Sequence, residues 1–255
     1  MKNGQLAPRS RPPISHYCSL LVLSAWAILL YRLDAQSLWY DEGYCIFVAH
    51  LPLREIIHWT AREFTPPLYH SLLALWLPLT GWTEFAARFL SVWAGTLMIA
   101  VMIRLGHDLH SRFAGFLAGL LAGVSPFYVW HGQDTRMYTF QALWGLLGTL
   151  FLLRALKSPA RRWLWAGLAL ADALALYTHT TSGFLLVFHA LVILAVGILS
   201  RRPALLKRGG YPSPWPRWPG SPGCSTPGPF WGRTVVTGPG NSTGSSSSQA
   251  RSGDS

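Results

Sequence analysis

The chain has 255 residues, of which 51% are hydrophobic and only 12% carry a charge. Soluble domains carry about a quarter charged residues, so this deficit, together with apolar runs near membrane-spanning length, excludes an ordinary soluble protein and predicts an all-α polytopic membrane protein. The net charge is +11, but Lys and Arg stand at the ends of apolar runs, where they indicate topology rather than a nucleic-acid surface.

The N-terminal region combines a short basic segment, residues 1–16, with a first apolar run at Tyr17–Leu33. A basic start would suit a signal peptide. However, the run is long for one, and Leu33-Asp34-Ala35 is a poor cleavage site. We therefore predict an uncleaved anchor whose N-terminus is cytoplasmic.

Residues 34–88 are amphipathic rather than uniformly apolar. Within them, Tyr44–Trp59 mixes apolar with His, Arg and Glu residues, which predicts a helix lying in the membrane interface. A second run, Leu68–Leu79, follows Pro66-Pro67 and is short for a full span. Five clearer spans come later, and small residues line the second of these, as close helix packing in lipid favours. The five are Phe89–Leu105, Phe113–Val129, Tyr138–Leu156, Trp163–Thr178 and Phe184–Leu199.

The topology depends on whether Leu68–Leu79 crosses the membrane. If it does not, 13 of the Lys and Arg residues up to Arg208 lie on the cytoplasmic side and 5 outside; if it does, these numbers are exchanged. The positive-inside rule favours the first arrangement. The sequence thus predicts about six spans and one long external loop at 34–88, with the 130–137 connector and His179 on the same outer face.

The segment 209–255 is rich in Gly, Pro and Ser, which predicts a disordered tail that buries no core. Its sequon, Asn241-Ser242-Thr243, is expected to be coincidental on a cytoplasmic tail. The three cysteines are far apart and show neither a disulfide framework nor metal-ligand spacing; they are Cys18, Cys45 and Cys224.

The pair Asp41-Glu42 is the only adjacent pair of carboxylates in the chain. It could be a solvated loop just outside a membrane helix. It could also be a general base whose neighbour orients it or binds a divalent metal. The aromatic flank of Trp39, Tyr40 and Tyr44 fits either an interfacial belt or a sugar-binding surface, so composition leaves both interpretations open.

Two arginines stand on the less positive outer face. Arg88 begins a span and Arg136 lies in a connector. Either side chain could simply reach to the interface, but a guanidinium fork is also suited to phosphate. We predict that Arg88 and Arg136 bind the phosphate of a ligand at this face.

The connector His131–Tyr138 is unusually polar for a link between apolar helices. It is either a solvated turn or a second wall of a site. The candidate substrate-binding side chains in and near it are Gln133, Asp134, Tyr138 and His179.

Asp172 lies well inside the predicted span Trp163–Thr178, where a carboxylate is costly and needs a partner. His179 follows two helical turns later on the same face. The pair could be structural, belong to the site or relay protons, and the sequence does not decide between these roles.

Five motifs occur in an order that resembles bacterial membrane glycosyltransferases of the GT-C superfamily. These are relatives of the protein O-mannosyltransferases (glycosyltransferase family 39) and of the aminoarabinose transferases that act on lipid A. The resemblance covers roughly residues 17–200. The motifs are Ser-Leu-Trp-Tyr-Asp-Glu-Gly-Tyr (37–44), Thr-Pro-Pro-Leu-Tyr (65–69), Glu-Phe-Ala-Ala-Arg-Phe-Leu-Ser (84–91), Ser-Pro-Phe-Tyr-Val-Trp-His-Gly-Gln-Asp-Thr-Arg-Met-Tyr (125–138) and Tyr-Thr-His (177–179).

This resemblance implies a GT-C-type bundle with two juxtamembrane helices in the first external loop. It also implies sugar transfer from a polyprenyl-phosphate donor to a glycan, lipid or protein acceptor at the outer face of the bacterial inner membrane. By position, Asp41 resembles the proposed catalytic base, Glu42 its acidic neighbour and Arg88 an arginine important in the mannosyltransferase branch. Thr65 and His70 depart from the pattern, because many relatives have His before the Pro-Pro pair and a second Tyr after it.

Relatives continue with further spans, whereas the similarity here stops near Arg208. The sequence therefore predicts a partial GT-C domain at 17–208, from a truncated or frame-shifted gene. The expected reaction is inverting transfer with Asp41 as base and Arg136 and Arg88 stabilising the leaving phosphate; a divalent metal near Glu42 stays open. The rival functions are a truncated non-catalytic membrane remnant, and a small proton-coupled transporter using Asp172 and His179.

Overall fold

The computed structural model describes residues 14–200, and the predicted tail at 209–255 and most of the predicted N-terminal segment 1–16 lie outside that range. Within it the chain forms ten α-helices and one 3₁₀ turn, with no strand. This confirms the all-α class. The elements are α1 (Ile14–Leu30), α2 (Tyr40–Ala49), α3 (Leu53–Arg62), α4 (Leu68–Thr80), α5 (Glu84–Leu109), α6 (Arg112–Gly123), α7 (Pro126–Gly132), α8 (Tyr138–Lys157), α9 (Arg162–Thr178), η1 (Thr180–Ser182) and α10 (Gly183–Ser200).

Three stretches within residues 14–200 are long and apolar enough to cross a membrane: α5, α8 and the run that contains α10. The α6–α7 pair is a fourth if it counts as one broken span, because the two helices bend by 69° at their junction. The other two predicted spans, α1 and α9, have 17 residues each. That gives about 25 Å of helix, somewhat less than the roughly 30 Å hydrocarbon core. The chain is a multi-pass membrane protein.

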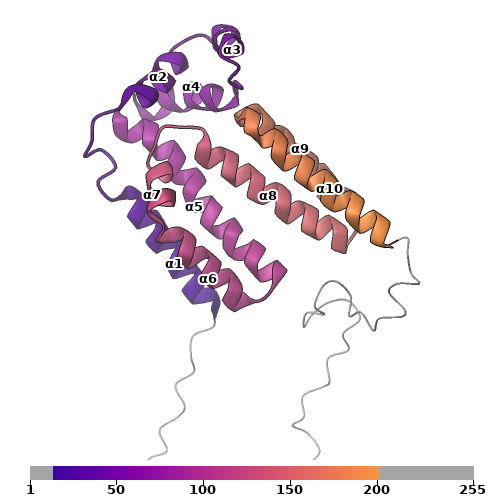
Figure 1. Cartoon of the computed structure of the whole chain (residues 1–255). Coiled ribbons are helices and arrows are strands. Elements are labelled where there is room, and N and C mark those ends of the chain that lie inside the picture. The colour runs from indigo at the N-terminus through magenta and orange to yellow at the C-terminus, as the bar shows by residue number, and fades with distance from the viewer. Residues whose placement is uncertain (1–13, 201–255) are drawn as a thin grey trace, which may run out of the picture. The chain divides into compact units, whose positions relative to one another are not determined.

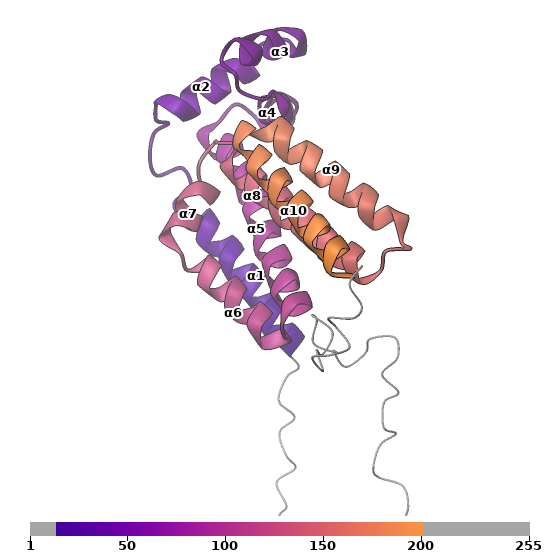
Figure 2. The same ribbon diagram turned by 45° about the vertical axis from the view of Figure 1, so that its right-hand side comes forward.

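Helix α5 is the centre of the packing, and α1, α6 and α8 all contact it, while α9 packs along α8 (Figures 1 and 2). The close crossing of α5 and α6 depends on glycine. A Cβ added to Gly115 would lie 2.3 Å from the carbonyl oxygen of Ile103, and one added to Gly106 would lie 2.8 Å from the Cα of Gly115. This bears out the expectation that small residues line a closely packed helix.

The first long loop folds into three helices, α2, α3 and α4, which lie at one end of the bundle in both views (Figures 1 and 2). The single helix predicted over Tyr44–Trp59 is wrong. The chain breaks between Ala49 and Leu53, because proline disfavours helical geometry in the residue before it and Pro52 is the N-cap of α3. Helix α2 also begins earlier than expected, so the acidic pair stands in its first turn.

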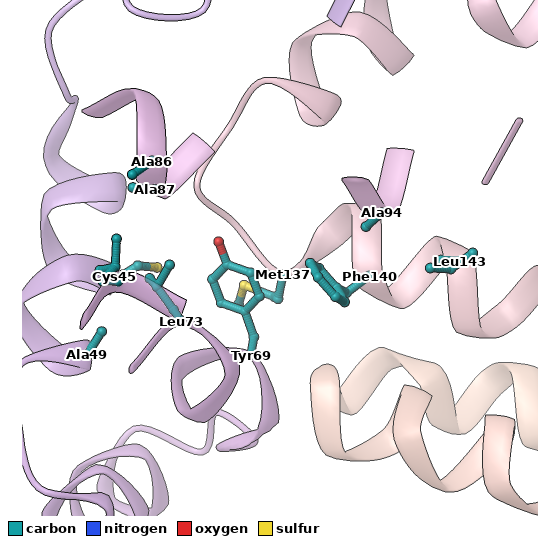
Figure 3. Close-up of a cluster of buried hydrophobic side chains, with 11 residues drawn as sticks. Cys45, Ala49, Tyr69, Leu73, Ala86, Ala87, Ala94, Met137, Phe140 and Leu143 are labelled. Atoms are coloured by element: carbon teal, nitrogen blue, oxygen red, sulfur yellow. The ribbon is translucent and has the colours of Figure 1, made fainter. Parts of the chain in front are cut away.

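A buried apolar cluster ties these loop helices to the long helices (Figure 3). Tyr69 of α4 is fully buried, and its ring lies between Leu73 and Cys45 on one side and Met137 and Phe140 on the other (Figure 3). Each fully buried large side chain of this kind contributes about 1.5–3 kcal/mol. The cluster therefore holds α2 and α4 firmly over the ends of α5 and α8.

The opposite end of the bundle gathers basic residues around Asp108. Its carboxylate is 2.8 Å from Nε of Arg154 and 3.1 Å from Nε of Arg104, and its carbonyl accepts a hydrogen bond from Lys157. These cations belong to the set predicted to be cytoplasmic. The bundle thus separates them from the end that carries the acidic pair.

Candidate active site

Glu42 is held by a bidentate ion pair with Arg88, the arrangement in which a guanidinium fork binds a carboxylate best. Oε1 is 2.9 Å from Nε, and Oε2 is 2.7 Å from a terminal nitrogen. Oε1 also accepts the backbone N–H of Thr135 at 2.9 Å. The Glu42 side chain is 1% exposed and that of Arg88 is 7% exposed, so the pair lies inside the protein.

Arg88 donates all five of its N–H groups within the protein. Besides Glu42, it binds the carbonyl oxygens of Leu33, Gln36 and Ser37 at 2.8, 2.7 and 3.4 Å. No donor is left for a phosphate. The geometry supports a role for Arg88 in fixing the 33–37 segment and the first turn of α2 onto α5, in place of the phosphate contact expected from the sequence.

The ionisation of Glu42 follows from these contacts. Burial by itself would raise the pKa of Glu42, but the hydrogen bonds from Arg88 and from the Thr135 backbone outweigh burial and lower it below its usual value. Glu42 is therefore a permanent anion at neutral pH. It joins three segments that are far apart in sequence: the start of α2, the start of α5 and the connector before α8.

Asp41 has a much looser partner. Its Oδ2 lies 3.3 Å from a terminal nitrogen of Arg136, and the Asp41 side chain is 38% exposed. Arg136 also donates to the Tyr138 hydroxyl at 3.1 Å. Its Nε is buried without a hydrogen-bond partner among the described residues. This cation retains capacity for a ligand.

A pocket of about 230 Å³ opens beside this second pair. It is smaller than the roughly 300–1,000 Å³ of sites for drug-sized ligands. Two carboxylates, a guanidinium, an imidazole and two phenols line it, which makes it suited to a small polar group. The lining residues are Tyr40, Asp41, Tyr44, Cys45, Glu63, Thr65, His70, Arg136 and Met137.

The predicted ligands Gln133 and Asp134 do not line this pocket. The Gln133 amide donates to the carbonyls of Leu29 and Tyr31 at 3.0 and 2.9 Å, which fastens the connector to the end of α1. Asp134 is buried and accepts the indole N–H of Trp39 at 3.1 Å. Burial, with the Glu42 charge nearby, raises the pKa of Asp134 to about 6 despite that hydrogen bond and the Arg136 charge.

Tyr138 and His179 lie beside Arg136. The guanidinium carbon of Arg136 is 5.3 Å from the centre of the Tyr138 ring, and the Tyr138 and His179 rings are 5.9 Å apart. Nδ1 of His179 accepts from the Thr181 backbone at 3.2 Å. Burial and then the Arg136 charge lower the pKa of His179. Neither residue lines the pocket.

Asp172 pairs with His189 and not with His179. Its Oδ1 is 2.9 Å from Nδ1 of His189, whose Nε2 is 3.1 Å from the Thr149 hydroxyl. His179 follows the last turn of α9 in extended geometry, which directs it away from the helix face. The sequence could not reveal this, because the true partner is on α10.

Several pocket residues were not predicted as site residues, among them Glu63, Cys45 and His70. Cys45 lies one turn after Asp41 on α2, a spacing that places both on one helix face. Glu63 is joined to the pocket through Tyr44, whose hydroxyl donates to its Oε2 at 2.5 Å. Only the tertiary packing of α2 against α4 brings His70 to the same place.

The side chains near Glu42 do not form a suitable metal site. Both Glu42 oxygens already accept hydrogen bonds from Arg88. Within residues 14–200, no group of three or more His, Cys, Asp and Glu side chains is placed to hold a metal ion. Ca²⁺ takes about six to eight oxygen ligands, which the described side chains around Glu42 do not supply.

The family model of the dolichyl-phosphate-mannose-protein mannosyltransferases matches residues 65–211, more than half of the chain. The chain belongs to this family. It is therefore a membrane glycosyltransferase of the GT-C type, as the motifs indicated. The chain matches no curated protein and no solved structure.

The match to the mannosyltransferase family includes Arg88 and Arg136 but begins after Asp41 and Glu42. The structure joins these two parts. Each carboxylate of the acidic pair meets one of the two arginines of the matched region, Glu42 with Arg88 and Asp41 with Arg136. The acidic pair is thus in direct contact with the family-matched region.

Proposed function

We propose that this chain transfers a sugar from a polyprenyl-phosphate donor to an acceptor hydroxyl, with Asp41 as general base and Arg136 as the phosphate-binding cation. The observation that carries the proposal is the pocket in which a half-exposed carboxylate and an incompletely paired guanidinium lie 3.3 Å apart. The family match supports a glycosyl donor carried by a polyprenyl phosphate.

The proposed step is a single displacement. Asp41 takes the proton of the acceptor hydroxyl as its oxygen attacks the anomeric carbon. The bond from that carbon to the phosphate oxygen breaks, and its electron pair leaves with the polyprenyl phosphate. Attack opposite the leaving group inverts the anomeric configuration. A phosphate leaving group is a weak base, so the site needs charge stabilisation, for which Arg136 is the candidate, and not a general acid.

Glu42 and Arg88 are proposed as positioning residues. Their bidentate pair fixes the first turn of α2, which presents Asp41 to the pocket. The Thr135 N–H bound to Glu42 fixes the connector, which presents Arg136. Preorganised charges of this kind are worth more than charges that must reorganise during reaction.

The proposed location is the outer face of the bacterial inner membrane, with the N-terminus in the cytoplasm. The excess of Lys and Arg on the opposite side supports this orientation. So does the gathering of Arg104, Arg154 and Lys157 around Asp108 at the other end of the bundle.

The test is donor turnover by the purified 255-residue chain in detergent. The donors are polyprenyl phosphates carrying mannose, glucose or arabinose, with extracted membrane lipids and glycans as acceptors, and the readout is released polyprenyl phosphate. Asp41→Asn is expected to reduce turnover by about 10²–10⁴, the usual contribution of a general base. Asp34→Asn, an exposed carboxylate of the same loop, is the matched control and should keep wild-type turnover.

Two results would overturn the proposal. Turnover by Asp41→Asn equal to wild type would remove Asp41 as the base. No turnover of any of the three donors by the wild-type chain would favour a non-catalytic membrane protein instead.

A further inference from the structure

His70 lies in α4, shortly after the Pro66-Pro67 pair, and only 2% of it is exposed. Two aromatic rings hold it edge to face: Tyr44 at 6.3 Å and Tyr69 at 5.8 Å between ring centres. The packing fixes the plane of the imidazole. Its orientation is therefore decided before any ligand arrives.

The polar atoms of this ring are incompletely used. Nδ1 of His70 is buried and has no hydrogen-bond partner among the described residues. Leaving a buried nitrogen unpaired costs free energy, and native proteins usually avoid it. At the same time His70 lines the pocket that Asp41 and Arg136 share. The His70 ring therefore has unused hydrogen-bonding capacity at the wall of the pocket.

The charge and the hydrogen-bonding capacity of the His70 ring indicate which ligand group it can bind. Burial first, and the Arg136 charge second, lower the pKa of His70 to about 4, with Glu63 opposing them weakly. The ring is neutral at neutral pH, so it offers one N–H donor and one lone pair. A hydroxyl, which both donates and accepts, complements such a ring. A phosphate would instead be attracted to Arg136, the charged neighbour.

The positions of Asp41, Arg136 and His70 indicate which part of the ligand each side chain would bind. In the proposed reaction the acceptor oxygen lies at Asp41 and the phosphate at Arg136, so the transferred sugar occupies the pocket that both residues line. The pocket of about 230 Å³ has the scale of one sugar ring. His70 is a buried, neutral side chain in its lining that can both donate and accept a hydrogen bond.

We propose that His70 is a specificity-determining residue that hydrogen-bonds a hydroxyl of the transferred sugar in the pocket beside Asp41 and Arg136. This inference rests on the proposed function, because it takes the ligand to be a polyprenyl-phosphate sugar. It predicts that His70 distinguishes a sugar-bearing lipid from the same lipid without its sugar.

The experiment measures dissociation constants in detergent by thermophoresis of the labelled full chain. The probes are polyprenyl phosphates carrying mannose, glucose or arabinose, and unmodified polyprenyl phosphate. His70→Leu removes both ring nitrogens at similar volume. It is expected to weaken binding of the preferred sugar lipid about tenfold, the value of one buried hydrogen bond. Binding of unmodified polyprenyl phosphate should stay within about twofold, because no sugar contacts the ring.

Three further variants sharpen the result. His70→Asn keeps an amide near the position of Nδ1 and should restore most of the lost affinity. Arg136→Gln should weaken binding of both kinds of lipid, since both carry the phosphate. His58→Leu makes the same chemical change at an exposed residue of α3 and should change neither constant. Thermal melting of each variant shows that it is folded.

Equal weakening of both lipids by His70→Leu, or no change in either, would overturn the inference. No binding of any sugar lipid by the wild-type chain would overturn it together with the proposed function. Sugar-dependent binding through His70 without turnover would refute only the catalytic proposal. Turnover that persists with unchanged sugar selectivity in His70→Leu would refute only the role of His70.

Discussion

Asp41 and Glu42 are neighbours in the chain, yet their ion pairs differ in almost every physical respect. Glu42 and Arg88 are 1% and 7% exposed and form two short hydrogen bonds with each other. Asp41 and Arg136 are 38% and 14% exposed and meet at one contact of 3.3 Å. The first pair is closed and supports the structure, whereas the second is open and can exchange partners. Adjacent carboxylates on a helix point in directions about 100° apart, so one enters the core and the other faces the pocket.

The largest effect is expected from breaking the closed pair. Glu42→Gln leaves Arg88 as a buried cation with an incomplete partner, and loss of one member of a buried pair typically costs about 3–5 kcal/mol. Thermal melting in detergent measures the loss. Glu55→Gln, at an exposed position of α3, is the control and should melt like wild type. A Glu42→Gln protein as stable as wild type would show that the pair is not a structural support.

Asp134, the buried carboxylate beside both ion pairs, is expected to make the stability of the fold depend on pH. The folded protein holds a proton on Asp134 up to about pH 6, whereas the ordinary pKa is 3.8. Because the folded state binds this proton more tightly than the unfolded chain, Asp134 makes stability fall as pH rises through that interval. Asp134→Asn should therefore melt higher than wild type at about pH 7.5 and lose the advantage near about pH 4.

Melting curves of wild type and Asp134→Asn across this pH range check the prediction. Glu42 has the opposite dependence, since its lowered pKa removes stability in acid. Glu42 is present in both proteins, so the difference between their melting temperatures reports the contribution of Asp134 alone. A difference that does not vary with pH would contradict the raised pKa.

The smallest effect is expected from removing the open pair. Asp41→Asn should change the free energy of unfolding by less than about 1 kcal/mol, because Asp41 is partly solvated, meets Arg136 at one contact of 3.3 Å, and loosely held ion pairs contribute little. The same protein should nevertheless lose its turnover. Denaturant titration of Asp41→Asn beside Glu42→Gln measures the contrast directly. Comparable losses of stability in the two variants would mean that both carboxylates are structural.

Much of the fold follows from sequence patterns. The six predicted apolar segments are helical, although Phe113–Val129 is divided between α6 and α7, and the small-residue face of α6 packs closely on α5. Hydropathy determines these features locally, since a segment in lipid must satisfy its own backbone hydrogen bonds. The sequence did not predict the break between α2 and α3, although Pro52 signals it, because the spacing of apolar residues continues across Pro52.

The candidate site could be predicted only in part. Asp41 and Arg136 were expected at one face from charge counting and motif order, and they do meet in a pocket. Arg88 was expected to bind phosphate, but its donors are satisfied by Glu42 and three carbonyl groups. Whether an arginine binds a ligand or the protein depends on how many acceptors surround it, which a sequence motif does not record.

The sequence by itself determined that this is a polytopic helical membrane protein of a glycosyltransferase family, because composition, apolar run length and ordered motifs are properties of the chain. Only the tertiary structure divided the acidic pair into a buried support and an exposed candidate base, paired Asp172 with His189 and brought His70 to the pocket. Those assignments depend on distances between helices that are remote in sequence. Burial and pairing, which set the charge and the freedom of each side chain, exist only once the helices have packed.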